Sequence, residues 1–440
     1  MAPRKPSKDG KIIIIGASPF GLSTALHLAA RGYKDITIFD NRSQSDLTDP
    51  SKQTIPYAAI HYRSADKTLH HNLSVEAFTA WNAWNKELWG GKTVPLGLSP
   101  EHRLFINNGY FYLFEGDSIP DADVARVRAL EQKGLGGVQL LTTDLGHVSS
   151  ANSRMFHIDP FRREERDKAN PGVLDTLGGT VLIENAYRFV LHKAQALGIK
   201  FVLGPQEGAV EEFAHSQLGN DGVRDVKGLR TRDGKTYDLD LAVWASEDSI
   251  PNIPSPLDTR ATRPIETTAV VKIPTDGELW DQFSPDNFPS WEHKLRNEQG
   301  AVLFGFPRDE AGRLIIGIRA TAGSNIARTD AATDRIKAFI AEFLPELKEA
   351  GLDVGKLSTS SPGKAFLRTI DRVPGVNNLF LVADASTSGE EFLLLPSIGG
   401  HVVEILEGGE PTVKAWRWKS GSSGKPITKS EQGRLLKAKL

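Results

Sequence analysis

The sequence predicts an α/β protein in which a discontinuous dinucleotide-binding domain carries an inserted, mainly antiparallel α+β domain. Three observations support this fold class. A buried strand, a glycine turn and a helix open the chain at residues 11–31. A similar pattern of buried strand and helix returns at 379–406. Between these ends, the segments from 260 to 320 alternate between apolar and polar residues as antiparallel strands do.

The length of the chain also favours two domains, because 440 residues exceed what one ordinary hydrophobic core organises. We expect the dinucleotide-binding domain to comprise residues 9–90, 178–255 and 365–410. The inserted, substrate-binding domain then comprises 91–177 and 256–364. Residues 411–440 are expected to form a C-terminal tail.

The first elements are predicted from their side-chain pattern. Residues 12–15 are all isoleucine, which suits a strand buried on both faces. The apolar spacing from Leu22 to Arg31 predicts a helix, and Gly32 is a good residue to end it. A second buried strand over 36–39 completes a strand–helix–strand unit.

The later elements are predicted with less local detail. We expect helices over 74–86, 181–197, 334–343 and 396–406. Strands are expected over 200–203, 267–273, 301–307, 313–318 and 379–385, with a hairpin that joins 226–231 to 237–244 through Asp233-Gly234. Residues 90–175 are expected to be irregular.

The turn GASPFG resembles the phosphate-binding pattern G-x-G-x-x-G. Gly16 and Gly21 occupy its first and third positions, and Ser18 replaces the middle glycine. A serine side chain narrows the approach of a phosphate but can donate a hydrogen bond to it. Asp40 ends the second strand, where a carboxylate binds the hydroxyls of an unphosphorylated ribose, as in FAD or NAD. The predicted nucleotide-binding residues are Gly16, Ser18, Pro19, Phe20, Gly21, Asp40 and Asn41.

Composition excludes several other classes of site. The formal net charge of −2 gives no basic excess for nucleic acid, and no apolar run approaches the roughly 20 residues that span a membrane. Cysteine is absent, which removes disulfides, thiol nucleophiles, thiolate metal ligands and cysteinyl cofactor linkages. His70 and His71 are adjacent and would point apart, so we predict no metal site.

Four stretches resemble the fungal fructosyl amino acid oxidases (amadoriases), relatives of monomeric sarcosine oxidase. They are GASPFGLSTALHLAARGYKDITIFD, LSVEAFTAWNAW, LIENAYRFVLHKAQALGIKFVLG, and the C-terminal TIDRVPGVNNLFLV with SGEEFLLLPSIGGHVVEILEG. The resemblance implies a two-domain flavoprotein that oxidises a C–N bond by hydride transfer to FAD, with oxygen as the electron acceptor.

The chain also departs from this family at several positions. Ser360 stands where the family's flavin-linking cysteine is expected, so the resemblance implies non-covalent FAD, or its loss. Glu391 replaces a glycine close to the flavin, and Leu393 replaces the lysine that pairs with a substrate carboxylate. The family's oxygen-activating lysine has no clear counterpart near 56–61. We expect Ser246, Glu391, Phe392 and Leu393 beside the cofactor, and His61, Arg63, Glu390 and Glu391 as catalytic or substrate-contacting candidates.

Two functional hypotheses follow. The first is an FAD-dependent oxidoreductase that acts on an amine or sugar-like substrate without the usual carboxylate anchor, in fungal specialised metabolism. The second is a flavin-free descendant of the fold that catalyses a dehydration, cyclisation or isomerisation, or only binds a ligand. Ala438-Lys439-Leu440 resembles a peroxisomal targeting signal, so we expect an import receptor as a partner and a peroxisomal, otherwise cytoplasmic, location.

Overall fold

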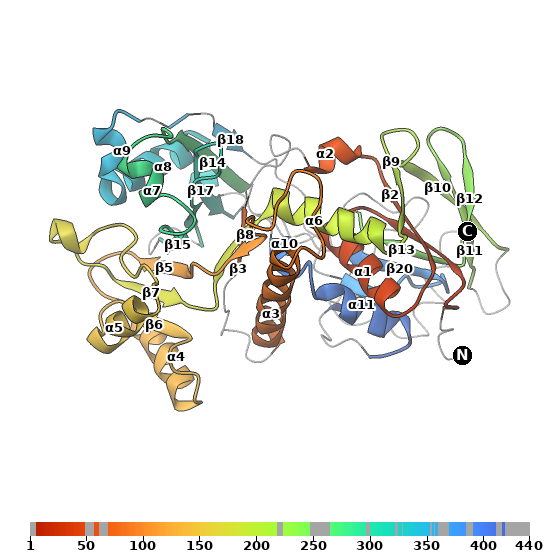
Figure 1. Ribbon diagram of the computed structural model, residues 1–440, viewed down its shortest axis with the longest axis horizontal. Helices are drawn as coiled ribbons and strands as arrows, with labels where there is room; N and C mark the ends of the chain where they lie inside the picture. Colours follow the sequence, from red (N-terminus) through yellow and green to blue (C-terminus); the bar gives the residue numbers. More distant parts are fainter. Residues whose placement is uncertain are drawn as a thin grey trace.

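Figure 1 shows the computed structural model of the chain. It describes residues 6–48, 57–60, 69–217, 223–246, 265–295, 300–321, 324–327, 329–352, 354–355, 357–359, 369–383, 390–410 and 416–418. For 57–60, 69–72, 327, 357, 383, 390 and 391 it describes the backbone alone.

The glycine turn leads into a mostly parallel sheet. Its strands are β1 (Lys11–Ile15), β2 (Asp35–Asp40), β9 (Lys200–Leu203), β13 (Leu241–Trp244), β19 (Thr369–Arg372) and β20 (Leu379–Ala383), in the order β19-β20-β13-β1-β2-β9. Only the β19–β20 pair among these is antiparallel. Because neighbouring parallel strands need a crossover, α1 (Pro19–Ala30) connects β1 to β2.

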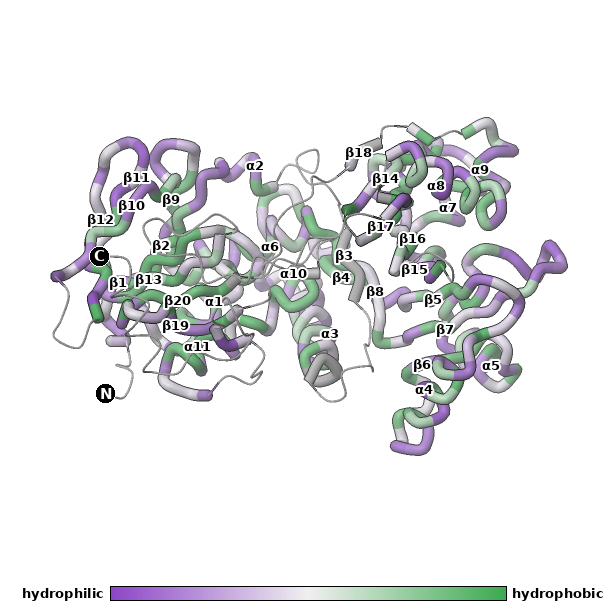
Figure 2. Tube along the Cα trace, turned by 180° about the vertical axis from the view of Figure 1, so that it is seen from behind, coloured by the Kyte–Doolittle hydropathy of each residue, from purple (hydrophilic) through white to green (hydrophobic). Residues whose placement is uncertain are grey.

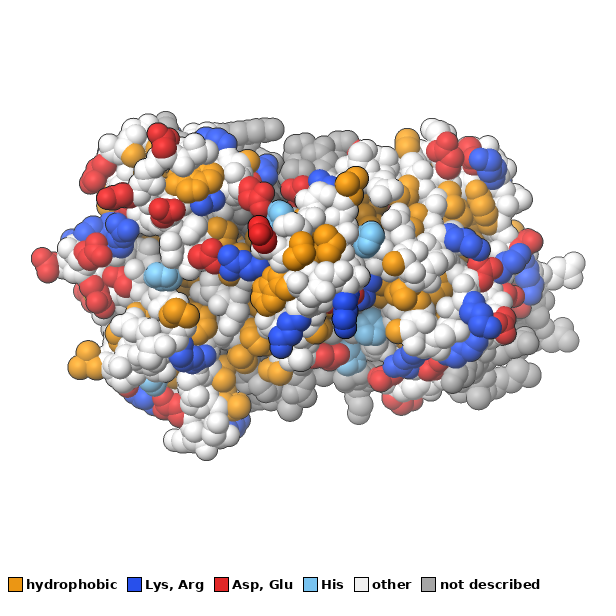
Figure 3. All heavy atoms as spheres, in the orientation of Figure 1, with side chains coloured by type: hydrophobic (Ala, Val, Ile, Leu, Met, Phe, Trp, Pro, Cys, Tyr) orange, Lys and Arg blue, Asp and Glu red, His pale blue; other side chains and the backbone are white. Residues whose placement is uncertain are grey.

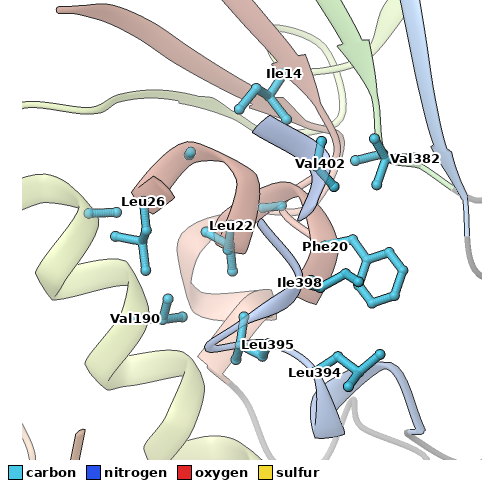
Figure 4. Close-up of a cluster of buried hydrophobic side chains, with 14 of the residues drawn as sticks. Ile14, Phe20, Leu22, Leu26, Val190, Val382, Leu394, Leu395, Ile398 and Val402 are labelled. Atoms are coloured by element: carbon cyan, nitrogen blue, oxygen red, sulfur yellow. The ribbon is translucent and has the colours of Figure 1, made fainter. Parts of the chain in front are cut away.

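Both faces of this parallel sheet are covered. Helices α3 (Leu69–Trp89), α6 (Ile183–Ala196) and α11 (Ile398–Leu406) share one hydrophobic core with α1. Figure 4 shows this core, where Leu22 and Leu26 of α1 lie near Val190 of α6 and Ile398 of α11. The opposite face packs against β10 (Val210–His215), β11 (Val226–Thr231) and β12 (Thr236–Asp238). Figure 2 shows the resulting hydrophobic colouring of β13, β20 and α11.

The expected single strand over 237–244 is wrong. The chain forms β12 as far as Asp238 and then enters the parallel sheet as β13. The change of sheet occurs at Asp240, whose backbone amide donates to the carbonyl of Lys11 at 2.9 Å and whose carboxylate accepts from the Lys11 amide at 2.8 Å. Asp240 therefore starts the pairing of β13 with β1, a contact that local alternation does not reveal.

A larger, mostly antiparallel sheet forms the other half of the molecule. Its strands are β5 (Tyr110–Phe114), β6 (Gln139–Leu141), β7 (Gly172–Asp175), β14 (Ile265–Lys272), β15 (Ser290–Lys294), β16 (Val302–Phe306), β17 (Arg313–Ala320) and β18 (Leu357–Thr359), in the order β18-β14-β17-β16-β15-β5-β7-β6. Among these pairs only β15–β5 is parallel. We call it the antiparallel sheet.

Helices cover one face of the antiparallel sheet and part of the other. The first face packs against α7 (Glu278–Gln282), α8 (Thr329–Phe343) and α9 (Pro345–Glu349). Helix α4 (Asp121–Gln132) packs over Tyr110 and Tyr112 on the second face, and α5 (Leu145–Ser153) follows β6. The expectation that 90–175 is irregular is therefore wrong. Its strands are short, and in β5 every residue is buried, so no alternation marks it in the sequence.

A small sheet lies between the two halves (Figure 1). It consists of β3 (Tyr57–Ile60), β8 (Gly179–Leu182) and β4 (Phe105–Ile106), and α10 (Glu390–Leu393) packs beside β3. We call it the junction sheet.

The remaining short helices among the described residues are α2 (Gln44–Thr48), η2 (Glu164–Arg166) and η3 (Asn325–Ala327). In the part of the chain that the structure describes, no helix is both long and apolar enough to cross a membrane.

Candidate functional site

The glycine turn after β1 needs its two glycines for backbone packing. Gly16 has a positive φ of 109°, which side chains disfavour, and a Cβ there would overlap the carbonyl oxygen of Ala245. A Cβ on Gly21 would overlap the carbonyl oxygen of Gly16. Gly16 therefore allows the turn to contact the residue after β13, and Gly21 allows the first turn of α1 to pack against the end of β1.

Ser18 begins α1, but its hydroxyl faces into the turn. The hydroxyl donates to the Ala245 carbonyl at 2.7 Å and accepts from the Gly21 amide at 3.2 Å. A hydroxyl here can donate to a phosphate, but in this structure its proton is directed to the Ala245 carbonyl and its oxygen caps α1 by accepting from the Gly21 amide. Pro19 at the first helical position has no N–H, and the Leu22 amide donates to the Ser18 carbonyl at 2.9 Å.

Asp40 lies at the end of β2, beside the glycine turn. Its Oδ2 accepts from the Ala17 amide at 2.7 Å, and its Oδ1 accepts from the Arg42 amide at 2.8 Å. The Arg42 guanidinium adds two bonds, Nε to Oδ1 and Nη2 to Oδ2, each at 2.9 Å. Burial lowers the pKa of Arg42, but hydrogen bonding to Asp40 and contact with Tyr187 outweigh it, so the pKa is raised overall. Asn41 is exposed.

The position of these residues in the fold fits a site for the ADP half of FAD. The turn, the N-terminal end of α1 and Asp40 meet at the carboxyl edge of parallel strands, where dinucleotides bind. Phe20 is buried in the core beneath the turn, and the backbone of Ser246 lies against Gly16. Sequence reasoning missed Arg42. The signal was a basic residue two positions after the predicted ribose-binding carboxylate.

The flavin-side candidates cluster around α10. Phe392 is buried, and its ring meets the Tyr187 ring edge-on at 5.1 Å between centroids. The carbonyl of Leu393 accepts from the Trp81 indole at 3.0 Å, and its side chain packs against the core around α1. Leu393 therefore brings no charge to this region. Glu390 and Glu391 begin α10, but their side chains, together with His61, Arg63 and Ser360, lie outside the described part.

The junction sheet connects α10 to the antiparallel sheet. The Thr180 hydroxyl of β8 is 2.7 Å from the Ser290 hydroxyl of β15 and donates to the Asn108 side chain at 3.2 Å. Leu182, at the end of β8, packs against Phe304, Phe306 and Ile315. The face of the antiparallel sheet that carries these residues, here called the inner face, therefore meets the junction sheet.

An ion pair lies on the inner face. Arg319 of β17 donates from Nε to Glu266 Oε1 of β14 at 2.6 Å, and the two residues are direct cross-strand neighbours. Their side chains are 23% and 7% exposed, respectively. The guanidinium carbon lies 5.3 Å from the ring centre of Phe304, within reach of a cation–π interaction. Sequence reasoning missed this pair, although charged residues in otherwise apolar strands could have indicated it.

Two further features of the described residues concern a metal site and a surface of one charge. No group of three or more His, Asp or Glu side chains is arranged to hold a metal ion in the part of the chain that the structure describes. Figure 3 shows acidic and basic side chains interspersed on the viewed face.

Comparisons with known proteins agree with this fold. The family model described as FAD dependent oxidoreductase matches residues 11–405. L-saccharopine oxidase of Schizosaccharomyces pombe is 24% identical over an alignment 436 positions long that covers 93% of each chain. The solved structure of fructosyl peptide oxidase from E. terrenum is 22% identical with a TM-score of 0.69, covering 98% of this chain and 95% of that one.

Amadoriase II, the deglycating fructosamine oxidase from Aspergillus fumigatus, is 20% identical with a TM-score of 0.62, covering 92% of this chain and 88% of that one. These likenesses confirm the predicted α/β fold with its inserted sheet domain and the resemblance to the amadoriase group. The domain boundaries and the roles of the individual site residues stay predictions.

Proposed function

The chain belongs to the FAD-dependent oxidoreductase family, and on this premise we propose that it oxidises a C–N bond of an amine. FAD is its cofactor. Because the chain has no cysteine, the flavin is not linked through a cysteinyl bond. When bound, FAD supplies the acceptor for the hydride that leaves the substrate carbon. The saccharopine oxidase and amadoriase relatives support an amine as the substrate class.

One observation carries the substrate side of the proposal: the ion pair between Glu266 and Arg319 on the inner face. Burying two charges costs free energy, so such a pair inside a sheet suggests a role beyond stability. Glu266 holds the Nε edge of the guanidinium and so fixes the direction in which the side chain points. We propose that Arg319 binds a carboxylate or hydroxyl group of the amine, since a guanidinium recognises both.

This arrangement explains how the site manages without the family's lysine at Leu393. Leu393 packs its side chain into the core around α1 and offers no charge. Arg319 would supply the cation from the other half of the molecule, across the junction sheet. The substrate therefore lacks the usual anchor on α10 but has one on β17.

The first test is an absorbance spectrum of the protein purified without added cofactor, repeated on the supernatant after acid precipitation. We expect a flavin spectrum that moves into the supernatant. Amines with and without a carboxylate are then screened for oxygen-dependent release of hydrogen peroxide. A protein that stays colourless and takes up no added FAD would contradict the proposal and select the second hypothesis, a redox-neutral enzyme or a binding protein.

The substrate anchor is tested with Arg319→Leu and Arg319→Lys. We expect kcat/KM for a carboxylated amine to fall at least tenfold in Arg319→Leu and less in Arg319→Lys, which keeps the charge but loses the planar fork. The matched control is Arg313→Leu, which breaks an ion pair with Asp309 at the opposite end of the same strand. If Arg319→Leu and Arg313→Leu behave alike, Arg319 does not bind the substrate.

We also propose oxygen as the electron acceptor and a peroxisomal location. The family resemblance supports the first, and Ala438-Lys439-Leu440, which lies outside the described residues, supports the second. Deletion of these three residues from a fluorescent fusion should move the protein out of peroxisomes. An unchanged distribution would contradict the targeting proposal. A role in specialised metabolism stays a prediction from the sequence.

A further inference from the structure

The carboxylate of Asp40 has its acceptor positions filled by the chain itself. A carboxylate offers about four lone-pair sites, two on each oxygen. Here Oδ1 accepts from the Arg42 amide and Nε, and Oδ2 accepts from the Ala17 amide and Arg42 Nη2. The hydroxyls of a ribose would need the same lone pairs. Ribose and the Arg42 guanidinium therefore compete for one group.

The two partners of this ion pair differ in how firmly they are held. The Asp40 side chain is 5% exposed and is fixed by two backbone amides, so it cannot turn away. The Arg42 side chain is 44% exposed and lies in a bend after β2. Releasing Arg42 moves its charge toward water and leaves the Asp40 carboxylate bonded to the Ala17 and Arg42 amides, which also hold Asp40 in place. Arg42 is therefore the partner that yields.

We propose that Arg42 is an internal competitor for the ribose site of FAD. In the chain without cofactor, its guanidinium neutralises Asp40 and takes the place of the ribose hydroxyls. Binding of FAD releases the guanidinium from Asp40 but leaves the two backbone amides in place. The affinity for FAD is then lower than the carboxylate alone would give, and Arg42 determines by how much it is lowered. This inference rests on FAD as the cofactor and not on the proposed substrate.

The surroundings of Arg42 give the displaced side chain a second partner. The guanidinium also interacts with the Tyr187 side chain of α6. Tyr187 is itself buried and meets Phe392 of α10 edge-on. Arg42 can thus keep one contact while it gives up Asp40. The same contacts connect the nucleotide end of the site to α10 through two aromatic rings.

The test is a titration of cofactor-free protein with FAD, followed by quenching of flavin fluorescence, so that no turnover is needed. Arg42→Ala should bind FAD about tenfold more tightly than the wild type, because the ribose no longer displaces charge-assisted hydrogen bonds. Arg42→Gln, which keeps a neutral donor and much of the packing, should show a smaller gain. Thermal unfolding of each variant checks that it is folded.

A double-mutant cycle separates competition from direct contact. Asp40→Ala should weaken FAD binding, and adding Arg42→Ala to Asp40→Ala should then change nothing, because the competitor has lost its target. The matched control is Lys200→Ala, which removes an ion pair with Asp35 at the opposite end of β2 from Asp40. It should leave FAD affinity unchanged.

Three results would overturn the inference. Weaker binding in Arg42→Ala, with or without Asp40, would mean that Arg42 contacts the cofactor directly. Equal affinity of Arg42→Ala and the wild type would mean that the two do not compete. No uptake of FAD by the wild type or by Arg42→Ala would mean that the carboxylate holds no ribose. As a second probe, ADP, followed through its displacement of bound FAD, should show the same pattern, and riboflavin, which lacks the adenosine ribose, should not respond to Arg42→Ala.

Discussion

The expected nucleotide end and the proposed substrate end of this protein are built in different ways. At the nucleotide end, the turn, Ser18 and Asp40 all come from one strand–helix–strand unit, and the fit depends on backbone contacts that admit only glycine. At the proposed substrate end, Glu266 and Arg319 come from two paired strands of the antiparallel sheet. One end is therefore specified by local sequence and the other by packing between distant segments.

The largest effect is expected in the aromatic core of the antiparallel sheet. Phe161 is fully buried and its ring contacts those of Phe111, Trp291, Phe339 and others. Phe161→Ala should lower the free energy of unfolding by about 4 kcal/mol, because it removes a large apolar side chain and leaves a cavity. Urea denaturation followed by tryptophan fluorescence measures this loss. A loss below about 1 kcal/mol would mean that this core is not close-packed.

The next effect is at the nucleotide end and is steric. Gly21→Ala should cost about 3 kcal/mol, because the added Cβ would overlap the Gly16 carbonyl oxygen and α1 would have to shift. The matched control is Gly136→Ala, where a Cβ meets nothing within 4 Å. Chemical denaturation of both variants tests the contrast. Similar stabilities of the two would show that the turn tolerates a side chain after all.

A third effect is a difference between the two halves in how their stability depends on pH. Burial lowers the pKa of His293, in β15, to about 4, below its ordinary value of 6.5. The unfolded chain then binds the proton more readily than the folded one, so stability falls as the pH falls from 6.5 toward 4. Between pH 7.5 and pH 5 the loss should be about 2 kcal/mol. The pH dependence of urea denaturation measures it.

Two variants check the assignment of this pH effect. His293→Gln cannot titrate and should flatten the profile over that range. His401, in α11, contributes a pH dependence of stability with the opposite sign. Its hydrogen bond to Glu76 raises its pKa despite burial. The stability from that pair is present below the unfolded pKa and is lost as the pH rises through the folded one. A His293→Gln profile as steep as that of the wild type would contradict the assignment.

The smallest effect concerns the replaced glycine. Ser18→Ala should cost about 1 kcal/mol, because the Gly21 amide loses its cap, whereas Ser18→Gly should cost only a few tenths. Differential scanning calorimetry resolves such changes when the three proteins are run side by side. Equal costs for the two variants would show that the hydroxyl is not the stabilising group.

The arrangement of Gly16, Gly21 and Asp40 could be predicted from the sequence, because they lie within one short strand–helix–strand unit, and their contact with a nucleotide stays a prediction. The contacts of Arg42 were missed, since nothing in the spacing says that its side chain turns back onto Asp40. Around the proposed substrate end, the sequence predicted antiparallel strands but not which residues face one another. Glu266 and Arg319 become neighbours through the pairing of β14 with β17, and a short buried strand such as β5 has no alternation to reveal it.

The parallel pairing of β5 with β15 has a consequence for synthesis of the chain. β5 and β7 are made early, but the strand that covers the other edge of β5 is made only after β8, α6 and the hairpin have been completed. Until β15 emerges from the ribosome, the aromatic segment Tyr110–Phe114 is an open edge strand. Such edges pair readily with other chains, so the nascent protein passes through an aggregation-prone interval before its second half arrives.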